Sequence, residues 1–416
     1  MGGSRKLEWK SLNDYILHEY VKTEKEVEND IFISKKIMYH IKHFFYMKIR
    51  KIRINTSQKN YSIYFGNNFI QNLSKYTIKE NIFFKKCLIV IDSKVSKKFL
   101  YKIKNSLKKK KLSFLIFNAS EKSKNMRTIK DILNLLLKNN FSRNDCLISL
   151  GGGITGDTTC FAASIFKRGI KFINIPTTLL AQVDASIGGK SGVNDKKFGK
   201  NQIGTFYQPD LVMSDTSFLK SLSKKEIICG YAEILKHSLI YSVNNFNYLN
   251  KYYKEIFNLK NPYILDAIYQ SCNIKKKIVE KDENEKELRK ILNLGHTFGH
   301  AYEAASGFGK KINHGEGVIL GIKSAIKFSL NKSYIKNKNY KKILDHLNKL
   351  DFNLKLKNIF NKNNISSLIK FMTYDKKNTS DKINLILLKD IGKPILNRKF
   401  DIKELKKFFN KELVNL

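Results

Sequence analysis

The segment NLGHTFGH (293–300) places two histidines four residues apart in a stretch with helical periodicity. If residues 288–304 form one helix, a single polar stripe contains Arg289, Asn293, His296 and His300. A buried apolar face does not accept such residues without partners, so simple packing of the histidines is the weaker interpretation. A further histidine, His314, follows in NHGEG. Two histidines with one carboxylate and an open position form the ligand set of a catalytic Zn²⁺, so a metal site is predicted here.

The segment CLISLGGGITGD (146–157) places glycines between an apolar run and a helical segment. It fits the pattern G-x-G-x-x-G, in which the backbone can approach a pyrophosphate at a helix N-terminus. A tight strand-to-helix turn would show the same pattern, so the motif alone leaves both interpretations open. The next apolar run, KFINI (171–175), ends without an acidic residue, so Asp92 and Glu121 are the better candidates for binding a ribose.

Two further segments contain polar residues among small ones. Residues 176–209 are rich in glycine, and we expect them to form an anion pocket with Thr177, Thr178, Asp184, Lys190, Lys200 and Asn201. The segment GYAEILKH places Glu233 and Lys236 three residues apart on one helix face. Taken alone, such a pair is usually part of a solvated helix face.

The elements around these residues alternate in the first half of the chain. Short apolar runs at 87–92, 112–117, 146–150 and 171–175 are separated by helical segments near 94–110 and 127–140. This alternation predicts an α/β domain with a parallel-rich sheet and a Gly-rich dinucleotide loop over residues 47–222. For residues 223–416 the pattern predicts a mostly α-helical domain with a hairpin at 382–400. A crevice between the two domains would hold cofactor and substrate. Residues 1–46 are an extension of unknown role that we expect to be dispensable for chemistry.

Composition excludes several functional classes. No run of about 18 uncharged apolar residues occurs, so no membrane span is expected. Five scattered cysteines are typical of reduced thiols in a cytoplasmic protein. The net charge of +42 could indicate a nucleic-acid partner, but the lysines are spread along the whole chain and accompany abundant Ile, Asn, Tyr and Phe. We therefore attribute the charge to compositional drift, expect no nucleic-acid or membrane partner, and expect faster encounter with small anionic substrates.

Together these segments resemble 3-dehydroquinate synthases, which belong to the sugar-phosphate cyclase superfamily and act in the shikimate pathway. The shared motifs, from GGGITGD through NLGHTFGHAYEA and NHGEGV to DKK (375–377), occur in the family's order from about Met47 onwards. The resemblance implies a homodimer that binds NAD and Zn²⁺, with Co²⁺ as an alternative metal. It implies conversion of 3-deoxy-D-arabino-heptulosonate 7-phosphate to 3-dehydroquinate and phosphate. The steps are transient oxidation by NAD, phosphate elimination, re-reduction and an intramolecular aldol cyclisation.

The resemblance also implies roles for individual positions. The metal ligands would be Glu233, His296 and His314. Cofactor contacts would come from Asp92, Glu121, Lys124, Gly153, Gly156, Asp157, Thr177, Thr178, Lys190, Lys200, Phe218 and Ser221. The catalytic residues would be Asp184, Lys190, Lys236, Lys275, Arg289 and His300. Substrate would be bound by Arg168, which would extend across the dimer, and by Lys200, Asn201, Asn293 and Lys376.

Two alternatives remain open from the sequence. One is a related enzyme, either another sugar-phosphate cyclase or a metal-dependent polyol dehydrogenase. The presence of His300 and the segment GKNQIG favours a dehydroquinate synthase over these relatives. The other is a non-catalytic, polyanion-binding derivative, for which loss of a metal ligand or of the glycine loop would be expected. None of those residues is missing.

Overall fold

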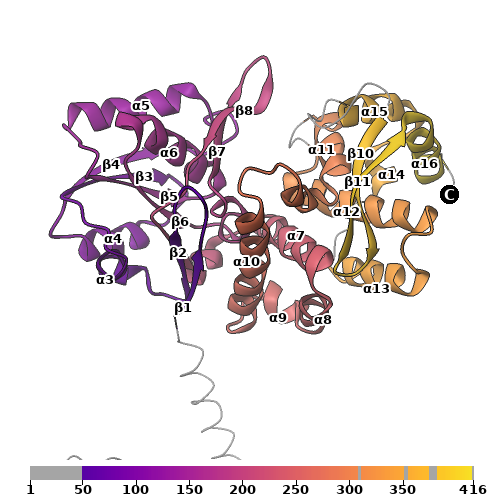
Figure 1. Cartoon of the computed structure of the whole chain (residues 1–416), viewed down its shortest axis with the longest axis horizontal. Coiled ribbons are helices and arrows are strands. Elements are labelled where there is room, and N and C mark those ends of the chain that lie inside the picture. The colour runs from indigo at the N-terminus through magenta and orange to yellow at the C-terminus, as the bar shows by residue number, and fades with distance from the viewer. Residues whose placement is uncertain (1–48, 308–310, 351–354, 374–381, 415–416) are drawn as a thin grey trace, which may run out of the picture. The chain divides into compact units, whose positions relative to one another are not determined.

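A seven-stranded sheet lies in the first half of the chain (Figure 1). The computed structural model describes residues 49–307, 311–350, 355–373 and 382–414. The strand order is β1-β2-β9-β6-β5-β3-β4. β1 is antiparallel to β2, and the other pairs are parallel. The strands are β1 Arg50–Ile54, β2 Tyr61–Gly66, β3 Lys86–Asp92, β4 Lys111–Phe117, β5 Cys146–Gly151, β6 Lys171–Pro176 and β9 Leu211–Asp215.

Helices cover both faces of this sheet, which is why its central strands are continuous apolar runs. Alternate residues of β3 point to opposite faces: Cys87 and Ile89 pack beneath α4, whereas Leu88 and Val90 pack beneath α5 and α6 (Figure 1). The helices of this half are η1 Ile70–Asn72, α3 Leu73–Lys79, α4 Lys97–Ser106, α5 Met126–Lys138, α6 Gly153–Ile165, η2 Phe166–Arg168, the π-helix η3 Ala181–Ala185 and η4 Thr216–Ser221. The strands and helices predicted from these runs are therefore confirmed.

The second half is mostly helical, with a two-stranded antiparallel hairpin, and this prediction is also confirmed. Its helices are α7 Lys224–Tyr241, α8 Val243–Lys251, α9 Tyr253–Phe257, α10 Tyr263–Lys281, η5 Leu288–Asn293, α11 His296–Ala305, α12 His314–Asn331, α13 Asn337–Asn348, α14 Leu356–Ile359, η6 Lys362–Asn364, α15 Ile365–Thr373 and α16 Ile402–Val414. The hairpin is β10 Lys382–Asp390 and β11 Lys393–Asp401. Among the described helices, none is long and apolar enough to cross a membrane. All five cysteines are free thiols, and four are buried.

One apolar core joins the two halves. Residues of the helical half pack in the same cluster as Ile52, Ile63 and Val212 of the sheet. Because this core includes residues of both halves, it does not mark a domain boundary, and the predicted division near residue 222 remains a prediction. Residues 1–46 lie outside the described part of the chain.

A second two-stranded ribbon projects from the α/β half, and the sequence did not predict it (Figure 1). It consists of β7 Lys190–Asp195 and β8 Gly199–Phe206, paired antiparallel. The first six residues of β8 are exposed. β8 therefore shows no apolar alternation, and the ribbon is anchored through β7, whose Val193 is buried in the core of the α/β half.

The single helix expected over residues 288–304 is wrong. The chain forms the short 3₁₀ helix η5, turns at Gly295 with φ +79°, and starts α11 at His296. A Cβ atom on Gly295 would lie 2.7 Å from the Ile322 backbone nitrogen, so only glycine fits this left-handed, close-packed position. Arg289 and Asn293 consequently belong to a different helix from His296 and His300, and the four residues do not form one stripe.

Candidate metal and substrate site

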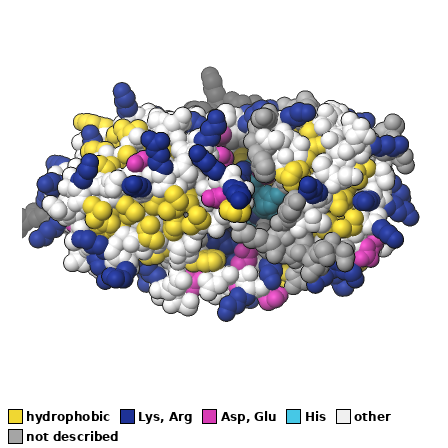
Figure 2. Space-filling view, turned by 90° about the horizontal axis from the view of Figure 1, so that it is seen from above, with side chains coloured by type: hydrophobic (Ala, Val, Ile, Leu, Met, Phe, Trp, Pro, Cys, Tyr) yellow, Lys and Arg dark blue, Asp and Glu magenta, His cyan; other side chains and the backbone are white. Residues whose placement is uncertain are grey.

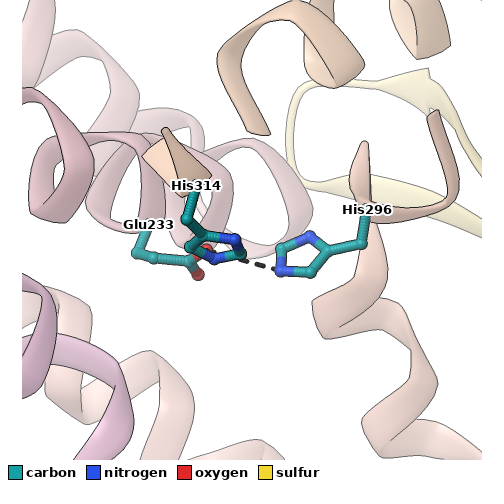
Figure 3. Close-up of side chains that lie close together, drawn as sticks. All are labelled: Glu233, His296 and His314. Carbon is teal, nitrogen blue, oxygen red and sulfur yellow. Dashed lines mark ion pairs between the residues drawn. The ribbon is translucent and has the colours of Figure 1, made fainter. Parts of the chain in front are cut away.

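Three predicted metal ligands from three helices lie together (Figure 3). Glu233 is in the middle of α7 and is almost fully buried. His296 is the first residue of α11, because the turn at Gly295 ends the preceding helix. His314 is the first residue of α12, where Asn313 and Glu316 form a capping box. Nε2 of His296 lies 3.5 Å from Oε1 of Glu233, and Nε2 of His314 lies 4.0 Å from the same oxygen.

The hydrogen bonds of the two imidazoles fit a metal at this position. Nδ1 of His296 lies 3.3 Å from the carbonyl oxygen of Leu294, and Nδ1 of His314 lies 2.9 Å from Oε1 of Glu303. Both acceptors favour the tautomer with hydrogen on Nδ1, which leaves each Nε2 lone pair directed at Glu233. Within the described residues, Oε1 of Glu233 has no hydrogen-bond partner although it is buried. A buried carboxylate oxygen that has no hydrogen-bond partner and faces two nitrogen lone pairs is a donor set suited to a divalent cation.

The electrostatic environment differs between the two histidines. Burial lowers the pKa of His296 well below its usual value, and neighbouring Lys236 lowers it further. Burial also opposes protonation of His314, but the carboxylate of Glu303 outweighs this effect and raises the pKa of His314. Near pH 7, His296 is therefore a neutral imidazole that can act as a metal ligand. A metal at His314 would compete with a proton for the ring.

Buried charges surround this cluster. Lys236 forms an ion pair with Glu233, and both side chains are at most 2% exposed. This pair does not lie on a solvated helix face. Lys275 on α10 lies 2.6 Å from the carboxylate of Asp184, which is on the π-helix η3. Burial would raise the pKa of Asp184, but Lys275 and Lys236 hold this pKa well below its usual value. Burial lowers the pKa of Lys275 despite its acidic partner.

Arg289 is also buried, and its guanidinium donates to the backbone carbonyl oxygens of Gly188 and Glu283. A Cβ atom on Gly188 would lie 2.3 Å from Nη2 of Arg289. The absence of a side chain at Gly188 thus lets the guanidinium approach the backbone closely. Asn293 donates to Glu285 at 3.0 Å, and Lys190 forms an ion pair with the same carboxylate. Glu285 thereby contacts both Lys190, a predicted catalytic and cofactor residue, and Asn293, a predicted substrate residue.

The predicted cofactor residues lie around the glycine loop and the ribbon. Lys124 lies 2.6 Å from Asp157 and donates to Asn201 at 2.6 Å. Lys200 lies 3.6 Å from Glu121 and 3.9 Å from Glu303, so it lies between the predicted cofactor region and the histidine cluster. One pocket is lined by residues that include Gly156, Asp157 and Lys190.

The remaining predicted cofactor residues lie at the ends of strands. Asp92 ends β3, and Thr177 and Thr178 follow β6. Gly153 begins α6 directly after β5, as predicted. Phe218 is buried against Phe99, and the hydroxyl of Ser221 donates to the Phe218 carbonyl oxygen. These positions lie at or after the carboxyl ends of strands, where α/β sheets bind ligands.

Two predicted substrate residues lie apart from these contacts. Arg168 is exposed in a turn where Lys167, Arg168 and Gly169 all have positive φ. Lys376 lies outside the described residues. Figure 2 shows histidine side chains reaching the surface beside basic and acidic side chains. The roles assigned to individual residues stay predictions, including those of the residues brought together here.

Three residues near the site were not predicted. Glu303 contacts His314, and Glu285 contacts both Lys190 and Asn293. His237 is fully buried, hydrogen-bonds Ser271 through Nδ1 at 2.7 Å, and lies close to Asp184 and Glu233. The spacing of Glu303, three residues after His300, could have placed it on the histidine face of the helix. No comparable sequence signal indicated Glu285.

The chain is similar to known proteins over most of its length. Residues 114–229 match the family profile described as 3-dehydroquinate synthase N-terminal, and residues 230–378 match 3-dehydroquinate synthase C-terminal. A 3-dehydroquinate synthase of Pelagibacter ubique is 52% identical over 367 residues, which cover 88% of this chain and all of that protein.

Two solved structures have a similar fold. A 2-deoxy-scyllo-inosose synthase, complexed with carbaglucose-6-phosphate, NAD⁺ and Co²⁺, has a TM-score of 0.78 at 25% identity, covering 88% of this chain and all of that one. A 2-epi-5-epi-valiolone synthase from Streptomyces hygroscopicus, with NAD⁺ and Zn²⁺ bound, has a TM-score of 0.74 at 21% identity, covering 85% of this chain and 97% of that one.

Proposed function

The chain belongs to the 3-dehydroquinate synthase family, and on that premise we propose that it converts 3-deoxy-D-arabino-heptulosonate 7-phosphate to 3-dehydroquinate and phosphate. The observation that carries this proposal is the arrangement of Glu233, His296 and His314. Both Nε2 lone pairs face one buried carboxylate oxygen that has no hydrogen-bond partner among the described residues. Such a site supports chemistry at a hydroxyl group, as the proposed reaction requires.

We assign the metal to these three residues and NAD to the region of the glycine loop. A Zn²⁺ or Co²⁺ ion, when bound, would polarise the substrate hydroxyl that is oxidised and stabilise its developing negative charge. NAD, when bound, would accept a hydride from that carbon and later return it. The assignment is supported by the NAD⁺ and the Co²⁺ or Zn²⁺ in the two structures of similar fold.

The cationic residues around the metal site suit an anionic substrate. Lys236 and Lys275 are buried ammonium groups beside Glu233 and Asp184, and each is paired before any ligand arrives. A phosphate or carboxylate that enters this region meets cations that are already held in place, which strengthens the interaction at low dielectric. We infer that these lysines bind the anionic groups of the substrate while Asp184 keeps Lys275 oriented.

His300 and the ribbon would complete the substrate site. The ring of His300 lies 5.2 Å from that of His296, and His300 is exposed. It can therefore contact a substrate whose hydroxyl lies on the metal. Lys190, Lys200 and Asn201 all belong to the ribbon β7–β8, so they would approach the substrate from the α/β half. Because the phosphate that leaves can itself take up a proton, no separate base residue is required.

Release of phosphate by purified protein tests the proposal. We expect turnover of the heptulosonate phosphate that requires both NAD and a divalent metal, and that stops when a chelator removes the metal. Glucose 6-phosphate is the comparison substrate for another sugar-phosphate cyclase, and we expect no phosphate release from it. A folded, metal-loaded protein that fails to release phosphate from the heptulosonate would refute the assignment. A preference for glucose 6-phosphate would favour the related cyclase.

We further propose that the enzyme acts as a homodimer in the cytoplasm. The support is the family resemblance and the exposed Arg168, which is held in a turn of positive φ and could reach a second copy. Light scattering coupled to gel filtration would measure the mass in solution. A monomeric mass in an active preparation would contradict the dimer.

A further inference from the structure

A carboxylate outside the predicted ligand set lies directly behind His314. Glu303 is on α11 and is 5% exposed. Its Oε1 atom lies 2.9 Å from Nδ1 of His314, and its Oε2 atom lies 3.9 Å from Nζ of Lys200. We propose that Glu303 is a positioning residue for the metal site, which holds the ring and the tautomer of His314 without binding the metal itself. This inference rests on the metal site proposed above.

The hydrogen bond from His314 to Glu303 fixes which ring nitrogen carries the hydrogen. An acceptor at Nδ1 places the hydrogen there and leaves the lone pair on Nε2. Nε2 of His314 is the atom that faces Oε1 of Glu233. The orientation that Glu303 imposes is therefore the one in which His314 can bind a metal shared with Glu233 and His296. His296 receives the same orientation from the backbone carbonyl of Leu294.

The contacts of the Glu303 carboxylate distinguish it from the proposed metal ligands. Glu303 also lies close enough to His300 and His314 to form another possible metal-binding group. Each of its oxygens, however, already faces a donor: Oε1 faces the imidazole of His314, and Oε2 faces the ammonium of Lys200. Glu303 thus accepts one hydrogen bond through Oε1 and forms an ion pair through Oε2. A metal at Glu303 would have to displace at least one of these donors.

Packing between α11 and α12 restricts where the Glu303 side chain can lie. Helices α11 and α12 approach closely because Gly299 and Gly317 face each other. A Cβ atom on Gly317 would lie 3.0 Å from Cγ and 3.2 Å from Oε1 of Glu303. The Glu303 side chain therefore lies against the backbone of α12, the helix that His314 begins. A side chain held in this way can fix its partner before the metal arrives.

Metal titration of Glu303 variants tests the proposal. Protein stripped by a chelator is titrated with Co²⁺, and its visible absorption spectrum reports the ligand set. Zn²⁺ affinity is measured by competition with a chromophoric chelator. We expect Glu303→Ala to lower affinity about 10- to 100-fold, the range for loss of an outer partner of a metal-binding histidine. Glu303→Gln keeps an acceptor oxygen, so its loss of affinity should be smaller.

The spectrum at saturating Co²⁺ decides between positioning and ligation. Because the ligands remain the same, both variants should reach the spectrum of the parent chain. A different saturated spectrum would show that Glu303 is itself a ligand, and an affinity within twofold of the parent would show that it has no role. Either result overturns the proposal. If the parent chain bound no Co²⁺, both the proposed metal site and the role of Glu303 would be wrong.

A matched control separates the local effect from the loss of a negative charge. Glu412 on α16 lies 2.7 Å from Lys327, which is on the same helix as His314 but several turns away. Glu412→Gln removes a carboxylate paired with α12 without touching the histidines, so its Co²⁺ affinity should match that of the parent. Thermal unfolding of every variant identifies loss of folding. An equal fall in affinity in the control would contradict a specific role for Glu303.

Discussion

The rings of His296 and His300 lie 5.2 Å apart on α11, yet the two residues belong to different clusters. His296 lies with Glu233 and His314, whereas His300 lies with Glu303 and His314. His296 is largely buried, and its Nε2 is directed at the Glu233 carboxylate, whereas His300 is exposed. Two histidines that share a helix face therefore need not share a function.

This difference predicts distinct outcomes for two alanine variants. His296→Ala removes a metal ligand. Its metal affinity should therefore fall by more than the about 10- to 100-fold that follows loss of an outer hydrogen-bond partner. His300→Ala should retain metal and lose phosphate release. Metal content by mass spectrometry, measured on the same samples as activity, provides the test. Equal loss of metal in both variants would disprove the division of roles.

The turn at Gly295 is expected to tolerate no other residue. Gly295→Ala would place a Cβ atom at φ +79° and 2.7 Å from the Ile322 nitrogen. The conformation alone costs about 1–3 kcal/mol, and the overlap adds to that cost. Gly199→Ala is the matched control, since Gly199 has φ +101° but no atom within 4 Å of its Cβ position. Urea denaturation should show a larger loss of unfolding free energy for Gly295→Ala than for Gly199→Ala. Equal losses would show that the contact with Ile322 does not add to the cost.

The pair of Asp184 and Lys275 should contribute to stability. Removal of one partner from a buried pair costs about 3–5 kcal/mol, but Asp184 is 32% exposed, so we expect about 2–3 kcal/mol for Asp184→Asn. Lys276→Met is the control, because Lys276 forms a more exposed pair with Glu280 at 3.8 Å and should change stability by less than about 1 kcal/mol. Unfolding free energies in urea measure both effects. A loss no larger than that of the control would contradict the prediction.

Glu283 should make stability depend on pH. Burial would raise its pKa, but hydrogen bonds from Ser57 and Gln208 outweigh burial and lower this pKa below 4.5. Because the folded chain binds this proton less readily than the unfolded chain, the stabilisation is present above pH 4.5 and is lost as pH falls through the folded pKa.

The variant Glu283→Gln tests this assignment. It should be less stable than the parent at pH 7 by about 1.5–3 kcal/mol, the contribution of hydrogen bonds to a charged group. The difference should shrink below pH 4.5. Unfolding free energies measured from pH 7 to pH 3 follow the change. A difference that stayed constant over this range would assign the effect to packing and not to the charge.

The sequence by itself determined the elements whose signals are local. The runs at 87–92, 112–117, 146–150 and 171–175 became β3, β4, β5 and β6. For β3, β5 and β6 the reason is that strands buried on both faces must be continuously apolar. The glycine loop was also recognisable from the local sequence, because a short glycine-rich connection between a strand and a helix can adopt few backbone conformations. The residues Glu233, His296 and His314 could also be selected in advance, through the order of motifs along the chain.

The tertiary structure alone decided how these residues meet. Helical spacing continues across Gly295, but the left-handed φ of this glycine, which lies closely packed against α12, interrupts the helix there. The pair of Glu233 and Lys236 is typical of a solvated face, yet it is buried because α7 lies within the core. The acceptor for Nδ1 of His314 comes from another helix, so helical spacing could place Glu303 on the histidine face of α11 but could not place it against His314. Local periodicity indicates which residues share a face, but only long-range packing determines what that face contacts.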